Sequence, residues 1–320
     1  MQKHTTESSF QKIHFIRIID YDYINTGDIF SSPLMYTYDF FKDYSVITHN
    51  LSAVRYSQIS KNDVVIIGGG GLFNYNPWFN FNVAINRILD LCDNVVVWGA
   101  GFNSHITKDG KLTEYSPLVD FSRFALYGIR DRDFEDYNFV PCASAMSPLL
   151  EKAYRTRPTK KIGTIFRTDE VRNENSLQLE GVQNLTHYNN YTTVMDFISA
   201  HEYIVTSSYH GALWATLANR KVIVPTALKV GFKYNYYGFP LTFIDDASSA
   251  KRLAAAMGQA KRNPDVLHDY RSKNYDFFEK VKRLVKSVIL VPDKSYEFFY
   301  KQNEAAEHYF KFKQIERNGK

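Results

Sequence analysis

The chain has 320 residues, of which 44% are hydrophobic and 23% charged, and its net charge is +5. This length predicts two domains, because one hydrophobic core rarely serves so long a chain. The modest positive charge is spread along the chain, which argues against nucleic-acid binding and leaves acidic substrates or an anionic membrane surface open. Only two cysteines occur, without CxxC spacing, so a disulfide framework and a zinc cluster are disfavoured.

The first twelve residues are polar, and no run of about 18 apolar residues occurs anywhere. We therefore expect neither a signal peptide nor a membrane span, and a cytoplasmic protein with at most peripheral contact at the inner face of the membrane. Aromatic residues reach 16%. The codon bias of an AT-rich host explains this abundance more simply than sugar stacking or a lipid-facing surface.

The first half of the chain alternates strand-like and helix-like patterns. Apolar runs predict strands at 13–19, 63–67, 94–98 and 124–129, and helices are expected at 33–42, 78–91 and 113–123. A loop over 20–28 follows the first strand. This alternation is typical of a doubly wound α/β sheet, in which ligands bind beyond the carboxyl ends of the strands.

Two glycine turns follow predicted buried strands, one at residues 68–71 and the other at residues 99–103. Glycine permits positive φ angles and lets a ligand or another backbone approach closely. Neither turn has glycine at the first, third and sixth positions of the dinucleotide fingerprint, and no Walker phosphate loop occurs. Nicotinamide chemistry and a P-loop nucleotide site are therefore disfavoured.

The second half repeats the alternation after a polar stretch that contains Pro158 and reads as a linker. Strands are predicted at 162–166, 203–206 and 221–225, and helices at 192–200, 210–219 and, as a pair joined near Pro264, over 247–288. We place an N-terminal Rossmann-like domain at 1–152, the linker at 153–160, a second Rossmann-like domain at 161–290 and a C-terminal helix at 291–320. That helix is expected to pack on the first domain, with membrane contact as the alternative.

The turn at residues 207–211 joins a predicted strand to a helix of small residues and places His210 at the helix start. The unpaired N–H groups of a helix start suit an anion, and His210 is the side chain there that titrates near neutral pH. A structural histidine bonded to a backbone carbonyl is the alternative. Ser207 and Ser208 lack the glycines of a nucleophile elbow, and the histidines are too scattered to predict a metal site.

Basic side chains follow several predicted strands. Arg130 and Arg167 stand at strand ends, and Lys229 and Lys233 follow the strand at 221–225. A guanidinium group binds phosphate or carboxylate through two hydrogen bonds. We expect these cations to face a cleft between the domains; for Arg130, a surface salt bridge to Asp131 is the alternative.

Several motifs, taken together, resemble the polysaccharide pyruvyl transferase family. They are residues 63–73 (DVVIIGGGGLF), Asn25-x-Gly27-Asp28, residues 97–101 (VWGAG), Arg130-Asp131, and residues 205–225 with His210-Gly211. The resemblance spans roughly residues 13–238. It implies a fold like the GT-B glycosyltransferases and transfer of a pyruvate ketal group from phosphoenolpyruvate to a sugar of a surface polysaccharide or of its lipid-linked or nucleotide-linked precursor. No cofactor or metal is expected beside phosphoenolpyruvate as co-substrate.

The resemblance gives roles to the residues singled out above. His210 is expected to act as the acid or base of ketal formation, while Arg130 or Arg167 holds the anionic donor. The predicted donor-binding residues are Arg130, Arg167, Ser208, Tyr209, Gly211, Lys229 and Lys233. The predicted acceptor or cleft residues are Asn25, Asp28, Gly69, Gly70, Gly71, Asn74, Gly99, Gly101 and Asn103.

One departure from the family pattern bears on the donor. The family commonly shows Arg-Leu-His at this helix start, where this chain has Ser208, Tyr209 and His210. A lost bidentate phosphate contact costs roughly 2–5 kcal/mol unless another cation, such as Arg167, Lys229 or Lys233, replaces it. Two alternatives therefore stay open: a glycosyltransferase that uses a nucleotide sugar in the same cleft, and a non-catalytic glycan-binding subunit.

Overall fold

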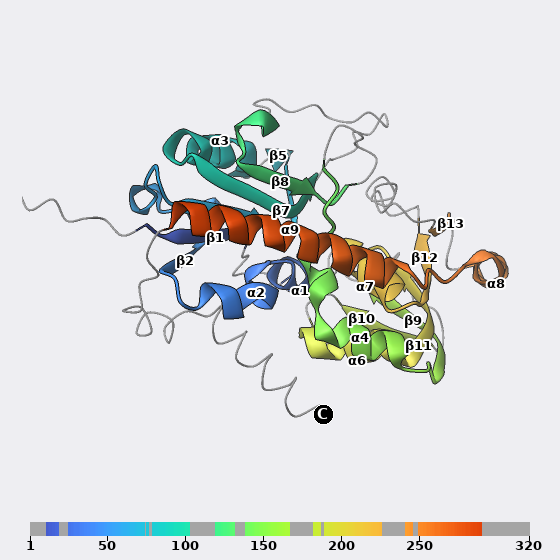
Figure 1. Cartoon of the computed structure of the whole chain (residues 1–320). Helices are drawn as coiled ribbons and strands as arrows, with labels where there is room; N and C mark the ends of the chain where they lie inside the picture. Colours follow the sequence, from blue (N-terminus) through green and yellow to red (C-terminus); the bar gives the residue numbers. More distant parts are fainter. Residues whose placement is uncertain are drawn as a thin grey trace, which may run out of the picture.

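The computed structural model describes residues 11–18, 25–73, 75–76, 79–102, 119–131, 138–166, 182–186, 189–225, 241–245 and 249–289. Within these residues the strands form two parallel sheets and one short antiparallel pair, and the two sheets lie side by side (Figure 1). The predicted site residues Asn74, Asn103, Arg167, Lys229 and Lys233, and the predicted helix at 291–320, fall outside the described residues.

The first sheet has the strand order β2-β1-β3-β7-β4, and β8 also pairs with β7. Its strands are β1 (Ile13–Arg17), β2 (Val46–Asn50), β3 (Val64–Gly68), β4 (Gly71–Phe73), β7 (Asn94–Phe102) and β8 (Leu126–Ile129). The antiparallel pair is β5 (Tyr75–Asn76) with β6 (Phe79–Asn80).

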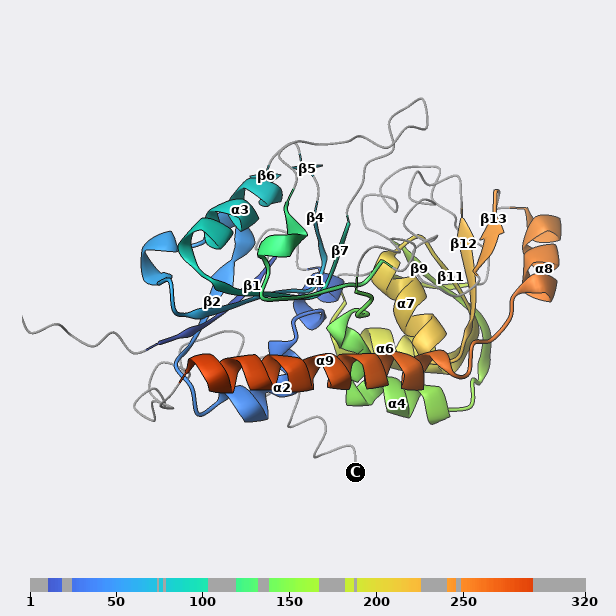
Figure 2. The same cartoon turned by 45° about the horizontal axis from the view of Figure 1, so that its top comes forward.

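Helices cover both faces of this sheet, which explains why β3 is an unbroken apolar run. Side chains alternate across the sheet, so Val65 and Ile67 pack towards α3 (Phe81–Leu91), while Val64 and Ile66 pack towards α2 (Leu34–Phe41) and the C-terminal helix α9. Figure 2 shows α3 on one side of the strands and α2 with α9 on the other.

The second sheet has the order β10-β9-β11-β12-β13, again with parallel neighbours. Its strands are β9 (Lys160–Phe166), β10 (Gln183–Thr186), β11 (His201–Thr206), β12 (Lys221–Pro225) and β13 (Thr242–Ile244). One face packs against α4 (Pro148–Arg155), α6 (Tyr191–Ala200) and α7 (Tyr209–Leu217), and the other against α8 (Ala250–Gln259). The predicted α/β class, with two parallel sheets between helices, is confirmed.

The long helix α9 (Val266–Val288) joins the two cores. Its first turns place Leu267 and Tyr270 in the core of the second sheet, and its later turns place Phe277 and Val281 in the core of the first. Between them, buried Asn274 accepts a hydrogen bond of 2.8 Å from the indole N–H of Trp98. The sequence prediction assigned this helix wholly to the second domain; instead its second half packs on the first, because its apolar face continues past the second sheet.

The predicted linker is corrected at its beginning. Residues 148–155 form α4, whose first residue is Pro148, and Leu150 and Ala153 are buried in the core of the second sheet. Only residues 156–159 lie between this helix and β9. The many Arg and Lys side chains suggested an irregular segment because they occupy the exposed face of an amphipathic helix.

Three further elements differ from the prediction. Residues 26–30 of the predicted loop form the short helix α1 (Thr26–Phe30), because the side chain of Asn25 caps it by accepting a hydrogen bond from the Gly27 amide. Strand β7 continues to Phe102 through the second glycine turn. Residues 121–123 form a single 3-10 turn where a longer helix was predicted. Among the described residues, no helix is long and apolar enough to cross a membrane.

Candidate functional site

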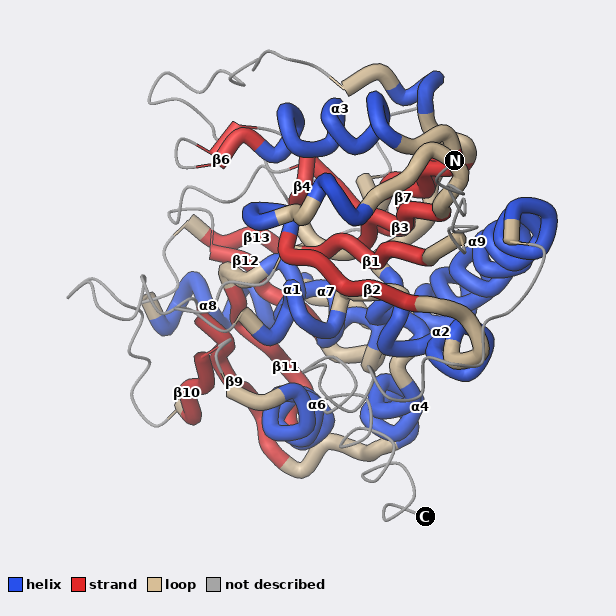
Figure 3. Tube along the Cα trace, turned by 90° about the vertical axis from the view of Figure 1, so that its left-hand side faces the viewer, coloured by secondary structure: helices blue, strands red, loops and turns tan. Residues whose placement is uncertain are grey.

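The carboxyl edges of the two sheets meet at α1 and α7 (Figure 3). The hydroxyl of Thr26, in α1, donates a hydrogen bond of 2.5 Å to the carbonyl of Asn189, just before α6. The ring of Phe30 stacks on that of Tyr191, with centroids 4.2 Å apart. Side chains that follow strands of one sheet therefore lie against the loop and helix starts of the other.

His210 lies at this junction and is only 6% exposed. Its Nε2 atom is 3.7 Å from the sulfur of Cys142, and its ring centroid is 5.2 Å from those of Tyr209 and Trp214. A Cβ atom on Gly27 would stand 2.1 Å from its Nδ1 atom, so α1 closes over the imidazole. Both halves of the chain thus enclose the predicted acid or base.

Ser208 and Gly211 set the start of α7. The Ser208 hydroxyl accepts a hydrogen bond of 3.3 Å from the Gly211 amide, so it is the N-cap of the helix. A Cβ atom on Gly211 would lie 2.6 Å from the hydroxyl of Thr206, so glycine lets the helix start sit tightly on β11. These contacts explain both residues structurally, and their predicted part in donor binding stays a prediction.

Arg130 reaches the same helix start from the end of β8. It is 5% exposed, and its guanidinium carbon lies 3.8 Å from the centroid of the Tyr209 ring, the geometry of a cation–π contact. Burial raises the pKa of the Tyr209 phenol well above its ordinary value, against the opposing effect of Arg130. The pair is therefore a neutral phenol beside a cation, close to His210.

Gly101 gives Arg130 the room that it needs. A Cβ atom there would lie 2.4 Å from Nε of Arg130 and 2.5 Å from Oδ2 of Asp131. The Asp131 carboxylate accepts a hydrogen bond of 2.6 Å from the Phe102 amide. Gly99, by contrast, has φ 63° and faces Pro141 and Cys142, so it serves close packing of the backbone there.

The first glycine turn lies against α1. Gly69 and Gly70 have φ angles of 81° and 82°, as predicted for a turn that needs glycine. A Cβ atom on Gly70 would be 3.3 Å from Oδ1 of Asp28, whose Oδ2 accepts a hydrogen bond of 2.8 Å from the Asn25 amide. Gly71 begins β4 and pairs with Gly101. The structure thus brings Asn25, Asp28 and both glycine turns together.

Cys142 is a site residue that sequence reasoning did not find. Its side chain is buried, and its sulfur lies 3.2 Å from the Ser144 hydroxyl and 3.7 Å from His210. Burial raises the pKa of the thiol, and the opposing charge of Arg130 and the hydrogen bonds from Ser144 do not reverse the shift. It is therefore a neutral thiol that packs beside the imidazole. No motif spacing marks this cysteine in the sequence.

A second group of histidines is buried within the first sheet. The His14 ring bridges Nε2 of His49, at 2.9 Å, and Oδ2 of Asp63, at 3.1 Å. Hydrogen bonds to the Asp63 carboxylate from His14 and from the amides of Lys12 and Ser60 keep its pKa below the ordinary value although burial acts the other way. Burial, together with repulsion from His14 and Arg55, lowers the pKa of His49 to about 4. Among the described residues, no group of three His, Cys, Asp or Glu side chains is placed to hold a metal ion.

Comparison with solved structures finds only distant likenesses. A protein from Klebsiella pneumoniae described as functionally uncharacterized is 18% identical, with a TM-score of 0.44 over 74% of this chain and 94% of that one. A UDP-GlcNAc 2-epimerase from Methanocaldococcus jannaschii is 10% identical, with a TM-score of 0.48 over 85% of this chain and 100% of that one. An alpha-glucosyltransferase in complex with UDP and DNA is 11% identical, with a TM-score of 0.40 over 93% and 100%.

No curated protein sequence matches the chain significantly. A family model does: the model of polysaccharide pyruvyl transferase matches residues 10–224. This range contains β1 to β12, and with them both glycine turns, Arg130 and His210. The chain therefore belongs to the polysaccharide pyruvyl transferase family, a family of transferases that act on sugar or polysaccharide acceptors.

Proposed function

We propose that the protein transfers a pyruvate ketal group from phosphoenolpyruvate to a sugar of a surface polysaccharide or of its lipid-linked or nucleotide-linked precursor. Family membership supports the transferase class and the sugar acceptor. The observation that carries the choice of donor is the position of Arg130, whose guanidinium carbon is 3.8 Å from the Tyr209 ring at the start of α7.

Arg130 supplies the cation that the local sequence lacks. The family commonly has an arginine near the start of this helix, and this chain has Ser208 and Tyr209 there. The end of β8 carries a guanidinium group to the same place from the other sheet, and the Tyr209 ring orients it. A planar guanidinium group, together with the N–H groups of a helix start, suits a ligand that carries both a phosphate and a carboxylate.

Ketal formation needs one proton transfer to carbon and two new C–O bonds. One sugar hydroxyl adds to C2 of phosphoenolpyruvate while the methylene carbon accepts a proton and becomes a methyl group. A second hydroxyl then displaces phosphate from C2, and its proton leaves with the phosphate. His210 is the proposed proton donor and acceptor in these steps, and Arg130 neutralises the charge of the departing phosphate.

The first sheet supplies the proposed acceptor side. The Asn25 amide holds one oxygen of the Asp28 carboxylate, at 2.8 Å, and the other oxygen faces Gly70. A carboxylate held in this way accepts hydrogen bonds from sugar hydroxyls, and glycine at positions 69 and 70 lets a sugar ring approach the backbone. This arrangement places acceptor groups on one sheet and donor groups on the other.

The test is release of phosphate coupled to a change in the acceptor. The protein is incubated with phosphoenolpyruvate and extracts of polysaccharide or lipid-linked sugar, and free phosphate and the mass of the glycan are measured. We expect phosphate release only with an acceptor, and a glycan that gains the mass of a pyruvate ketal. Binding of a nucleotide sugar without any reaction of phosphoenolpyruvate would favour the glycosyltransferase alternative, and glycan binding without turnover would favour a binding subunit.

A further inference from the structure

A basic hollow opens at the amino edge of the second sheet, away from His210. Its volume is about 640 Å³, within the range typical of small-molecule sites. It lies where β9 and β11 begin, whereas His210 follows the end of β11. Six residues of parallel strand, roughly 20 Å, separate the two places. The hollow is therefore distinct from the junction described above.

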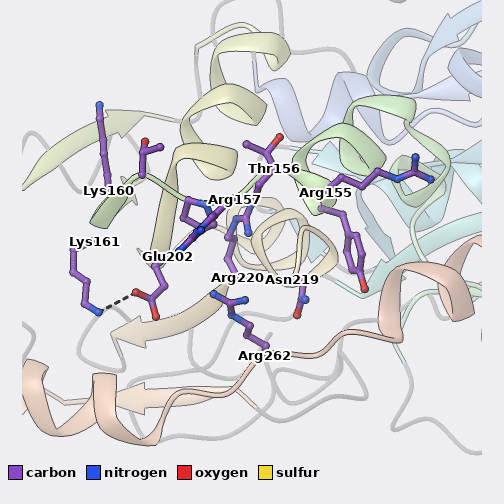
Figure 4. A pocket seen from close by; sticks show the side chains of 12 residues that line it. Arg155, Thr156, Arg157, Lys160, Lys161, Glu202, Asn219, Arg220 and Arg262 are labelled. Carbon is purple, nitrogen blue, oxygen red and sulfur yellow. Dashed lines mark hydrogen bonds and ion pairs between the residues drawn. The ribbon is translucent and has the colours of Figure 1, made fainter.

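The lining of the hollow is strongly cationic. Twelve described residues line it, of which six are Arg or Lys and one, Glu202, is a carboxylate. These cations are Arg155, Arg157, Lys160, Lys161, Arg220 and Arg262. Figure 4 shows them around the hollow, with the ion pair between Lys161 and Glu202 on one side.

Three of the six cations already have structural partners. Lys161 pairs with Glu202 at 2.9 Å, and Arg155 pairs with Glu151 at 2.8 Å. Arg220 is 2% exposed and donates hydrogen bonds to four carbonyls, of Ala153, Thr156, Ile198 and Ser199, at the ends of α4 and α6. Arg220 therefore ties the two helix ends together, and Lys161 and Arg155 balance local acids.

The other three form a surplus of positive charge. Arg157 and Arg262 are exposed and have neither a carboxylate nor a carbonyl partner among the described residues, so they do not cap the helix ends. The Lys160 amino group donates a hydrogen bond of 2.7 Å to the neutral side chain of Gln183. Burial, and then repulsion from Arg262, lowers the pKa of Arg220 to about 10, which reflects how closely the cations are gathered.

We propose that this hollow is a second binding site, for a diphosphate or closely spaced phosphate ester. A diphosphate carries two to three negative charges, which matches the surplus of Arg157, Lys160 and Arg262. A single carboxylate would leave most of that charge uncompensated. Exposed guanidinium groups bind phosphate oxygens in pairs. The phosphate comes either from a soluble diphosphate compound or from the headgroup of an anionic lipid.

Isothermal titration calorimetry of the full chain with inorganic pyrophosphate, at low ionic strength, tests this site. The variant Arg157→Ala/Arg262→Ala should weaken one binding step by about tenfold or more, because it removes two charge-assisted contacts. The matched control, Lys280→Ala/Arg283→Ala, removes two exposed charges from α9 and should bind as the parent does. All these side chains are exposed, so the thermal midpoints of both variants should stay close to that of the parent.

Cosedimentation with vesicles distinguishes the two sources of phosphate. If vesicles that contain phosphatidylglycerol bind the control but not the Arg157/Arg262 variant, and pyrophosphate displaces the protein from them, the ligand is a lipid headgroup. If the two proteins differ in pyrophosphate binding alone, the ligand is a soluble diphosphate. Equal binding of both probes by the two variants, or no binding of either probe by the parent, would overturn the proposal. None of these readouts depends on pyruvyl transfer.

Discussion

Two buried histidines in this molecule have opposite surroundings. His14, which is 0% exposed, has partners from neighbouring segments of one sheet: His49 in β2, and Asp63 just before β3. His210 has neighbours from well-separated parts of the chain, namely Gly27 in α1, Cys142 before α4, and Trp214 in its own helix. Burial alone therefore does not mark a functional histidine. The convergence of both halves of the chain does.

The hydrogen bonds of the His14 group also explain why it is structural. The ionised Asp63 carboxylate accepts the Nε2 proton of His14, so Nδ1 of His14 accepts the Nε2 proton of His49. This order leaves Nδ1 of His49 unprotonated, and a proton there would have no acceptor among the described residues. The network is stable only with neutral His49, which agrees with its lowered pKa.

Replacing each histidine with glutamine should separate the two roles most strongly. His210→Gln should lower the rate of phosphate release from phosphoenolpyruvate by a factor on the order of 10²–10⁴, because the proposed proton donor is lost. Its free energy of unfolding should change little. The measurements are turnover with a glycan acceptor and urea unfolding.

His14→Gln is the counterpart. It should lower the free energy of unfolding by roughly 1–3 kcal/mol, since a buried carboxylate loses its partner, while turnover of the folded protein stays near that of the parent. If His14→Gln abolished turnover in protein shown to be folded, or His210→Gln left it unaltered, the contrast between the two histidines would be wrong.

Gly27→Ala tests whether α1 closes over His210. The new Cβ atom would stand 2.1 Å from Nδ1 of the imidazole, so the ring or α1 must move. We expect turnover to fall by about 10–100-fold, because displacement of a reacting group by even about 1 Å is costly. The control is Gly258→Ala in α8, where nothing lies within 4 Å of the new atom. That variant should keep full activity and gain up to about 1 kcal/mol of stability.

Acid should weaken the His14 group before any carboxylate of ordinary pKa is protonated. His49 has a pKa of about 4 in the folded protein against 6.5 ordinarily, so the unfolded chain binds the proton first as the pH falls. The stabilisation is complete above pH 6.5 and is lost progressively towards pH 4, by on the order of 2–3 kcal/mol. Asp63, whose pKa is lowered, adds its own loss at still lower pH.

Urea unfolding of the parent and of His49→Leu, measured from pH 4 to 7.5, checks this. The variant lacks the titrating ring, so its stability should depend less steeply on pH in this window, even though it is less stable overall. Parallel curves for the two proteins would show that His49 is not the group responsible.

Arg130→Lys should have the smallest effect of the four. Lysine keeps the charge but loses the planar group that stacks on Tyr209, so we expect the KM for phosphoenolpyruvate to rise about tenfold with a smaller change in kcat. Arg87→Lys is the matched control, because Arg87 makes a similar contact with Tyr56, at 4.1 Å, on α3 far from the junction. A KM that is the same in both variants would remove Arg130 from donor binding.

Much of the fold could be read from local patterns. The unbroken apolar runs of β3 and β7 predicted strands buried on both faces, and the sequence around Pro264 predicted the break between α8 and α9. The errors came from segments whose local signals compete. Asn25 can cap a helix or start a turn, and the cationic face of α4 resembles a linker when its buried positions, Leu150 and Ala153, are overlooked.

The sequence by itself determined the ends of the strands, the positive φ angles at Gly69 and Gly70, and the placement of His210 at a helix start, because each depends on neighbours within a few residues. Only the tertiary structure decided what surrounds His210. Contacts between Arg130 and Tyr209, or between Cys142 and His210, join positions 79 and 68 residues apart, and no local pattern encodes such a meeting. They arise because the carboxyl edges of two parallel sheets are held together by α1, α7 and the long helix α9.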